Sequence, residues 1–349
     1  MLACVDVDYR QGGAWAGLMT FEQWDDPQPL GQRVVFCDQV GEYRSGQFYA
    51  RELPALLTAL DTLPQMPDLV VVDGYCWLGP ERPGLGSYLS RSIGRPVMGV
   101  AKNPFRACPG TPVLRGRSQT PLYVTACGLS PQESVEWLQR MHGDYRIPTL
   151  LRRVDQLARG RHESVLRLRP EALQEQGAVA QLVFDAFLGH PHHPPGSLPC
   201  EPAIVAGLRA AGVLTLSLVA EQAGELLGHL AFSPVVLNGQ SGTWFGLGPV
   251  SVKPAWQNQG IGSSLVRYGI SLIRGAGAGG IVLLGEPEYY SRFGFRAHSG
   301  LTYADAPPEY FLALSLAEPI PLGEIAYHRA FEAGLDKNDL GRVEPNSGG

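Results

Sequence analysis

A glycine-rich turn in the second half of this 349-residue chain has the residue types and spacing to bind phosphate. The turn has the pattern Gln257-x-Gln259-Gly260-x-Gly262, and it follows a strand-like run and precedes a helical pattern. Such a turn points backbone N–H groups and the positive end of a helix at one spot, which suits a pyrophosphate. Taken alone, the motif is also typical of an ordinary tight turn.

Four charged residues of the first half lie in or at the ends of predicted strands, or near the start of a predicted helix, where catalytic residues are often found. Asp6 is part of an alternating, strand-like run, and Asp73 ends a continuous apolar run that predicts a covered central strand. Glu52 comes near the start of a helical pattern. Lys102 ends another apolar run and is the only lysine among the first 160 residues, which favours a point charge or a proton donor. Acids at strand ends are also often solvent-exposed caps.

The order and flanks of these residues give the first half a resemblance to a known family. Asp6 lies in Val-Asp-Val, Glu52 in Arg-Glu-x-Pro, Asp73 in Val-Asp-Gly, and Lys102 ends Gly-Val-Ala-Lys. In this order they resemble endonuclease V, an RNase H-like nuclease family that cuts near deaminated purines. Residues 143–155 resemble the family's carboxyl-terminal segment, with the Arg and Asp that follow it. The resemblance spans nearly all of residues 1–158.

The resemblance implies a metal-dependent hydrolysis of phosphodiesters in DNA or RNA that contains a deaminated base such as inosine. The family's metal ligands correspond to Asp6, Glu52 and Asp73, which would bind Mg²⁺ or Mn²⁺ through oxygen atoms. Lys102 would stabilise the charged transition state. Nucleic-acid contacts are expected from Tyr43, Arg82 and Arg146, with Tyr43 on the loop that wedges in beside the altered base.

Several positions depart from the family's pattern. The His-Pro-Arg that follows the second aspartate in the family is here Gly-Pro-Glu-Arg, which leaves only Arg82. Ser45 stands in the wedge loop where a proline is usual, and Tyr145 stands where some members have a histidine near the metal. These changes bear on substrate choice more than on metal binding. A first domain that binds nucleic acid without cutting it, and so tethers the second domain, therefore stays open.

The second half resembles another family. The turn at residues 257–262 is followed by a helical pattern, the apolar run Ile281–Leu284, Tyr289-Tyr290 and a Phe-Gly-Phe ending at Phe295. This order resembles the GNAT superfamily of acetyl-CoA-dependent N-acetyltransferases over roughly residues 163–332. In that family the turn binds the cofactor pyrophosphate, the preceding strand splays to receive the pantetheine arm, and a tyrosine protonates the leaving thiolate.

Carried over to this chain, the resemblance implies an acetyl-CoA site and a general acid. The cofactor-binding residues would be Val250, Val252, Gln257, Gln259, Gly260 and Gly262. Tyr290 would be the general acid, with a packed core aromatic as the alternative. The amine acceptor and the general base stay unassigned: Glu221, Glu225 and His229 lie in a hairpin-like segment, but each is expected to be a solvated strand or turn residue.

Length and composition favour two soluble domains. We expect an α/β (α+β) protein, with an RNase H-like mixed-sheet domain at residues 1–160, a GNAT-fold domain at 161–334 and a flexible tail at 335–349. The expected protein is bifunctional, a DNA-repair-type nuclease and an acetyltransferase, and it is cytoplasmic with no membrane partner, because no long apolar run or basic-then-apolar leader is found. The six cysteines are scattered without a Cys-x-x-Cys pair, and the prolines around His190 favour a surface loop over a metal site.

Overall fold

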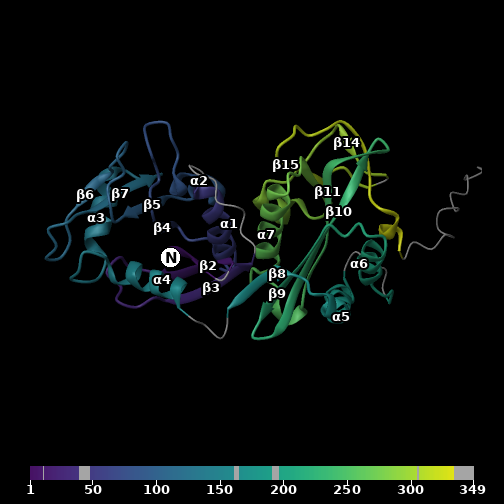
Figure 1. Ribbon diagram of the computed structural model, residues 1–349, viewed down its shortest axis with the longest axis horizontal. Coiled ribbons are helices and arrows are strands. Elements are labelled where there is room, and N and C mark those ends of the chain that lie inside the picture. The colour runs from purple at the N-terminus through teal and green to yellow at the C-terminus, as the bar shows by residue number, and fades with distance from the viewer. Residues whose placement is uncertain (11, 39–47, 161–164, 191–195, 305, 334–349) are drawn as a thin grey trace, which may run out of the picture. The chain divides into compact units, whose positions relative to one another are not determined.

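The computed structural model describes residues 1–349 except 11, 39–47, 161–164, 191–195, 305 and 334–349 (Figure 1). Two compact units divide the chain. The first consists of Met1–Pro170, Leu218–Gly228 and Trp256–Gly275, and the second of Glu171–Ser217, His229–Ala255 and Ala276–Gly349. Two short segments of the second half are thus grouped with the first unit. Among the described residues, every helix is too short or too polar to cross a bilayer.

A mixed sheet forms the centre of the first unit. The strand β1 (Leu2–Arg10) pairs antiparallel with β2 (Gly13–Phe21) and parallel with β4 (Leu69–Asp73). The strand order across this unit is β8-β3-β2-β1-β4-β5-β7-β6. The remaining strands are β3 (Gly31–Asp38), β5 (Val97–Ala101), β6 (Thr111–Val113), β7 (Leu122–Cys127) and β8 (Leu166–Pro170). An antiparallel β1-β2-β3 meander beside parallel β4 and β5 is the mixed RNase H-like sheet that the sequence predicts.

Helices cover this sheet because each presents one apolar stripe. The helix α4 (Thr149–Arg159) packs against β1 and β2 and buries Leu150, Val154 and Leu157, which recur at helical spacing. The helix α1 (Phe48–Asp61) packs against β2 and β3, and also against α7 (Ile261–Gly275), where Arg267 pairs with Asp61 at 2.5 Å. The unit also contains α2 (Leu85–Ile93), α3 (Pro131–Arg140) and most of β9 (Leu216–Gln222).

The second unit is built on a smaller sheet with the order β13-β15-β12-β11-β10, shown in green in Figure 1. Asn238 and Gly239 both have positive φ, of 49° and 77°, and this conformation makes the tight hairpin turn between β10 and β11. The strands are β10 (Glu225–Leu237), β11 (Gln240–Val252), β12 (Gly280–Leu284), β13 (Arg296–Ala297), β14 (Leu301–Thr302), β15 (Phe311–Ser315) and β16 (Gly323–Ala326). The helices are α5 (Gln176–Phe187), α6 (Glu201–Ala210) and the short α8 (Pro287–Tyr290).

Two neighbouring strands of this sheet separate before they end. The parallel register of β11 with β12 runs from Trp244 and Gly280 to Gly246 and Val282. On its other side β12 stays paired with β15 as far as Leu284. The strand β11 continues to Val252, so that its last residues run on beyond the pairing. Their backbone groups are not used by β12, which is the splayed arrangement expected from the sequence.

Candidate functional sites

Three aspartates lie together at one edge of the first unit's sheet. One carboxylate oxygen from each of Asp6, Asp73 and Asp155 lies within 4.8 Å of the others. The parallel register pairs Val5 of β1 with Val72 of β4, so Asp6 and Asp73 each follow the last paired residue and reach the same edge. Asp155 comes from α4, which packs against β1. The structure therefore brings together two of the three predicted metal ligands and adds a third acid.

Sequence reasoning placed Asp155 in a family-like segment but did not assign it to the metal site. The apolar residues of α4 recur at helical spacing, and this pattern predicts that the helix packs on the sheet. It does not say which strand end the helix reaches. Asp155 becomes a neighbour of Asp6 because α4 packs on β1, and the sequence does not show this contact.

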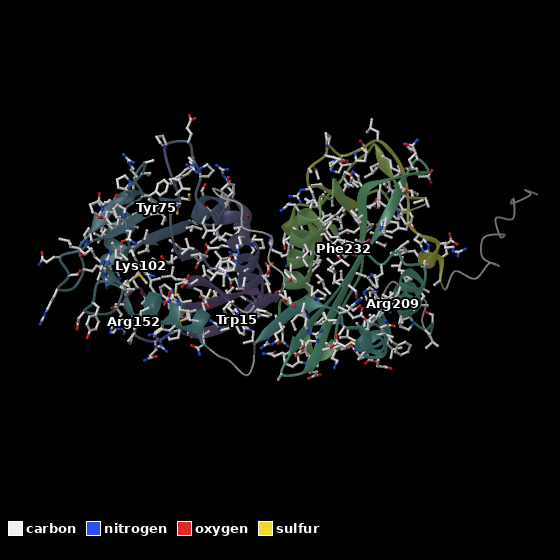
Figure 2. All side chains as sticks on the ribbon, in the orientation of Figure 1. Trp15, Tyr75, Lys102, Arg152, Arg209 and Phe232 are labelled. Atoms are coloured by element: carbon white, nitrogen blue, oxygen red, sulfur yellow. The ribbon has the colours of Figure 1, made fainter. Side chains whose placement is uncertain are left out.

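Lys102 lies against the same carboxylates. Its Nζ atom is 2.7 Å from Asp73 Oδ2 and 4.0 Å from Asp155 Oδ1. Lys102 and Arg152, both labelled in Figure 2, line a small cavity of about 60 Å³ together with the three aspartates. This volume is enough for a few water molecules or one cation. The site thus combines three acids with one neighbouring ammonium group; Asp6, Asp73 and Lys102 are residues that the sequence analysis singled out, and Asp155 is an addition.

Crowding and burial make Asp6 and Glu52 hard to ionise. Burial, and then the charges of Asp73 and Asp155, raise the pKa of Asp6 from 3.8 to about 7. Burial, and then the charges of Asp6 and Asp73, raise the pKa of Glu52 from 4.5 to about 8. A divalent cation would relieve this repulsion, and an all-oxygen donor set is what Mg²⁺ and Mn²⁺ prefer. The residues present therefore fit the metal that the sequence predicts.

Glu52 is placed differently from the three aspartates. It lies on α1, is 8% exposed, and is outside the group of carboxylate oxygens that approach within 4.8 Å among the described residues. Its carboxyl group is still close enough for Asp6 and Asp73 to raise its pKa. Glu52 is thus part of the same charged site, at its buried side.

The three expected nucleic-acid contacts have different surroundings. Tyr43 lies outside the described residues. Arg82 is exposed, in a turn where its backbone N–H donates to the carbonyl of Gly79. The guanidinium of Arg146 donates to the carbonyl of Lys102 and, at 2.8 Å, to that of Pro121. Arg146 therefore holds the backbone of the residue that carries the site's ammonium group.

Replacing Arg146 with Ala is expected to lower the free energy of unfolding by about 2 kcal/mol, because charged hydrogen bonds to two backbone carbonyls are lost. Urea denaturation of both proteins measures the change. The matched control is Arg82→Ala, which removes an exposed arginine and is expected to leave the stability within about 0.5 kcal/mol of the parent. Weaker nucleic-acid binding by Arg146→Ala at unchanged stability would contradict a structural role.

The second site surrounds Tyr290, in the short helix that follows β12. The Tyr290 ring lies edge-on to those of Tyr289 and Phe295, at centroid distances of 4.9 and 6.0 Å. It also fills the space in which a side chain at Gly285 would lie. Burial, and then Tyr289, raise the pKa of Tyr290 well above its ordinary value. The hydroxyl therefore keeps its proton, which is the state required of a general acid.

A cavity of about 830 Å³ lies beside this tyrosine, within the second unit. Its wall includes Leu247, Gly248, Pro249 and Val250 of β11, the residues that run on after the pairing with β12 ends. Leu284 and Gly285 line it as well, and so does Tyr290. Val252, the other predicted backbone contact, lies two residues further along β11. The cavity is thus bordered by the part of β11 to which the family resemblance assigns the thioester arm.

The glycine-rich turn leads directly into α7, as predicted. Gln257 and Gln259 are exposed, and the carbonyl of Gly260 accepts a hydrogen bond of 2.9 Å from the N–H of Ser264 in the first turn of the helix. Gly260 has a φ of 80°, and a side chain there would meet the backbone carbonyl of Asp61. Glycine is therefore required at position 260 by conformation and by space, whatever the turn binds.

The expectation that His229 is a solvated residue is wrong. This histidine is fully buried in β10, where its Nε2 lies 2.8 Å from Ser217 Oγ. Burial, and then the charge of Arg209, lower its pKa from 6.5 to about 3, so the imidazole is neutral at physiological pH. Glu221 pairs with Arg169 at 2.8 Å. Neither residue lines the cavity beside Tyr290.

Each half of the chain matches the model of a known protein family. A family model described as endonuclease V matches residues 1–125, and one described as a GNAT acetyltransferase domain matches residues 215–297. The chain carries an endonuclease V region followed by a GNAT acetyltransferase domain. Both families are enzyme families, and the two resemblances inferred from the sequence are confirmed.

Individual proteins are similar to one or the other part of the chain. The chain is 40% identical, over 104 residues, to an uncharacterized N-acetyltransferase, YhbS, of Escherichia coli K12; the match covers 29% of this chain and spans 62% of that relative's length. A GNAT family acetyltransferase of Brucella melitensis, solved with acetyl-CoA, is 45% identical, and the match covers 49% of this chain and 99% of that one with a TM-score of 0.43. An endonuclease V of Streptomyces avermitilis is 29% identical, with coverages of 45% and 79% and a TM-score of 0.39.

Proposed function

We propose that the endonuclease V region is a divalent-cation-dependent endonuclease that cleaves DNA or RNA near a deaminated base of the inosine type. The observation that supports this most strongly is the cluster of Asp6, Asp73 and Asp155 with Lys102 beside it. Asp155 reaches the two strand-end acids from the helix α4, and capping of strand ends does not account for this third acid. The substrate class comes from the family.

Asp6, Asp73 and Asp155 would hold Mg²⁺ or Mn²⁺, with Glu52 at the buried side of the site. When bound, the cation supplies Lewis-acid activation of water and of the phosphodiester. The ammonium group of Lys102 stabilises the negative charge that develops on the phosphate oxygens during hydrolysis. Asp73 and Asp155 orient this ammonium group, because both carboxylates lie within 4.0 Å of Nζ.

Without a divalent cation, the free energy of unfolding is expected to fall as the pH rises from about 5 to about 8. Asp6 and Glu52 have folded-state pKa values of about 7 and about 8, above their ordinary 3.8 and 4.5. A carboxyl group whose pKa is raised by folding contributes stability at acid pH and loses it as the pH passes the folded pKa. Mg²⁺ should therefore raise the melting temperature more at about pH 8 than at about pH 5, where protons occupy the carboxyl groups.

Thermal unfolding at both pH values, with and without Mg²⁺, measures this difference. The double variant Asp6→Asn, Glu52→Gln carries no titrating group at these two positions, so the part of the pH dependence due to them should disappear with it. An equal Mg²⁺ effect at the two pH values, or the same effect in the double variant, would contradict a cation bound by these acids.

We propose that the GNAT domain transfers the acetyl group of acetyl-CoA to an amine. The exposed turn with Gln257, Gln259, Gly260 and Gly262 would bind the pyrophosphate at the start of α7. Val250 and Val252 would offer backbone groups to the pantetheine arm. The amine nitrogen attacks the thioester carbonyl carbon, the carbon–sulfur bond breaks, and the Tyr290 hydroxyl donates its proton to the leaving sulfur. The amine attacks in its neutral form, the proton that it loses on forming the amide passes to solvent, and the Tyr290 phenolate regains a proton from solvent.

The position of Tyr290 is the observation that supports this transfer. Its protonated side chain lines a cavity whose wall also includes the part of β11 that extends beyond the pairing with β12. Calorimetric titration of the full chain with acetyl-CoA tests the cofactor assignment. Saturable binding with one molecule per chain is expected, and absence of binding would overturn the proposed transferase.

A further inference from the structure

The cavity beside Tyr290 restricts which class of amine could be the acceptor. We propose that the acceptor is a small aromatic primary amine without an acidic group. This inference rests on the proposed acetyl transfer and names its substrate class. It is drawn from the size, the ring-lined walls and the charge of the cavity, all of which belong to the second unit.

The size of the cavity exceeds what the end of a thioester arm needs. About 830 Å³ is within the range of pockets that enclose a complete small molecule. Gly285 and the part of β11 that extends beyond the pairing with β12 form one part of the wall, at the proposed thioester position. The remaining space lies among residues of α5, α6 and the segment after β14. An acceptor there would lie within reach of Tyr290.

Aromatic rings make up much of this remaining wall. Tyr303 and Phe331 each lie 4.8 Å from the ring of Tyr327, at interplanar angles of 66° and 55°. Phe187 and Tyr310 also line the cavity. Tilted rings offer edges and faces to a further ring, and their negative faces attract a cation. The wall therefore suits a ligand that combines an aromatic ring with an ammonium group.

Carboxylates outnumber basic groups in the wall of the cavity. Glu201, Glu286 and His190 line it, and none of its described lining residues is a lysine or an arginine. An ammonium group would be stabilised by the two carboxylates, whereas a carboxylate or a phosphate would be desolvated beside these like charges, with one imidazole as its single basic neighbour in the described wall. This charge distribution disfavours free amino acids and phosphorylated amines as acceptors.

A buried hydroxyl supplies a second, independent observation. The Tyr327 hydroxyl is buried, lines the cavity through its ring, and has no hydrogen-bond partner among the described residues. A buried hydroxyl without a partner is costly, so a polar group of a ligand is the expected partner. A bound primary amine has N–H groups to donate to this oxygen, as well as to the carboxylate of Glu201.

Acetylation of three matched amines by the full chain tests this inference. The probes are 2-phenylethylamine, n-hexylamine, which lacks the ring, and L-phenylalanine, which adds a carboxylate. Release of CoA and mass spectrometry of the N-acetyl products give kcat/KM for each. We expect 2-phenylethylamine to exceed n-hexylamine by about tenfold and L-phenylalanine by about a hundredfold.

A variant of the cavity wall separates a binding role from a general loss of fold. Glu201→Gln should raise the KM for 2-phenylethylamine by about tenfold and leave the KM for acetyl-CoA unchanged. The control is Glu288→Gln, an exposed residue of α8 that does not line the cavity and should change neither constant. Equal effects of the two variants would overturn the role of Glu201 in binding the amine.

The outcomes distinguish this inference from the transferase proposal on which it rests. If acetyl-CoA binds but L-phenylalanine or n-hexylamine is acetylated as well as 2-phenylethylamine, or no probe is acetylated, the acceptor class is wrong and the cofactor site stands. If acetyl-CoA does not bind, the proposed transferase itself fails, and the acceptor inference fails with it.

Discussion

Asp6→Asn is expected to reduce Mg²⁺-dependent cleavage of inosine-containing nucleic acid by at least about a hundredfold. The substitution keeps the size of the side chain but removes one charged oxygen ligand from the cluster that Asp6 forms with Asp73 and Asp155. The amide cannot replace the carboxylate in balancing the cation's charge, so the cation binds more weakly and is held less well in the position where it would activate water. Initial rates of nicking across a range of Mg²⁺ concentrations measure both effects.

The neighbouring acid on the same strand provides the control. Asp8 lies two residues further along β1 and pairs with Arg10 at 2.7 Å, away from the three-aspartate group. Asp8→Asn removes the same charge from the same strand and should leave cleavage near the parent rate. Equal losses in the two variants would mean that general charge or folding, and not metal binding, explains the effect.

Tyr290→Phe is expected to lower kcat for acetyl transfer by about a hundredfold while the Kd for acetyl-CoA stays unchanged. The phenyl ring keeps the packing against Tyr289 and Phe295, and only the proton donated to the leaving sulfur is lost. Single-turnover kinetics and calorimetry give the two constants separately.

Tyr289→Phe is the matched control for this prediction. Tyr289 also lines the cavity, and its ring lies edge-on to that of Tyr290. It should retain most of the parent kcat. A Tyr290→Phe variant with parent kcat would contradict the assignment of Tyr290 as general acid and favour the alternative of a packed core aromatic.

The two proposed activities use separate sets of residues, which gives a further check on these variants. The acid cluster lies in the first unit and the cavity beside Tyr290 in the second. Asp6→Asn should therefore leave acetyl transfer unchanged, and Tyr290→Phe should leave cleavage unchanged. The two variants thus serve as folding controls for each other.

The sequence predicts well those features that depend on local pattern. Asp6 and Asp73 could be placed at strand ends because the strands β1 and β4 are marked by alternation and by a continuous apolar run. The turn before α7 and the aromatic helix after β12 were also predicted, because glycines and tyrosines at fixed spacing mark them.

Features that depend on packing between distant segments could not be predicted in this way. Asp155 joins the acid cluster only because α4 packs on β1, a contact between residues about 150 positions apart. His229 was expected to be a solvated strand or turn residue, yet it is buried in β10 with its Nε2 beside Ser217 Oγ. The wall of the cavity likewise comes from separate segments, from α5 to the residues after β16. The hydrophobic periodicity of a helix or strand indicates which of its faces is buried. It does not indicate which other helix or strand packs against that face.

The most direct test of the central claim is cleavage of a labelled duplex with one deoxyinosine by the purified full chain in Mg²⁺. An undamaged duplex and an inosine-containing RNA serve as the other substrates, and Asp73→Ala is assayed alongside. We predict specific nicking of an inosine-containing substrate that disappears in the variant, because Asp73 belongs to the acid cluster and orients Lys102. Binding without cleavage, or nicking that survives in Asp73→Ala, would contradict a nuclease centred on these aspartates.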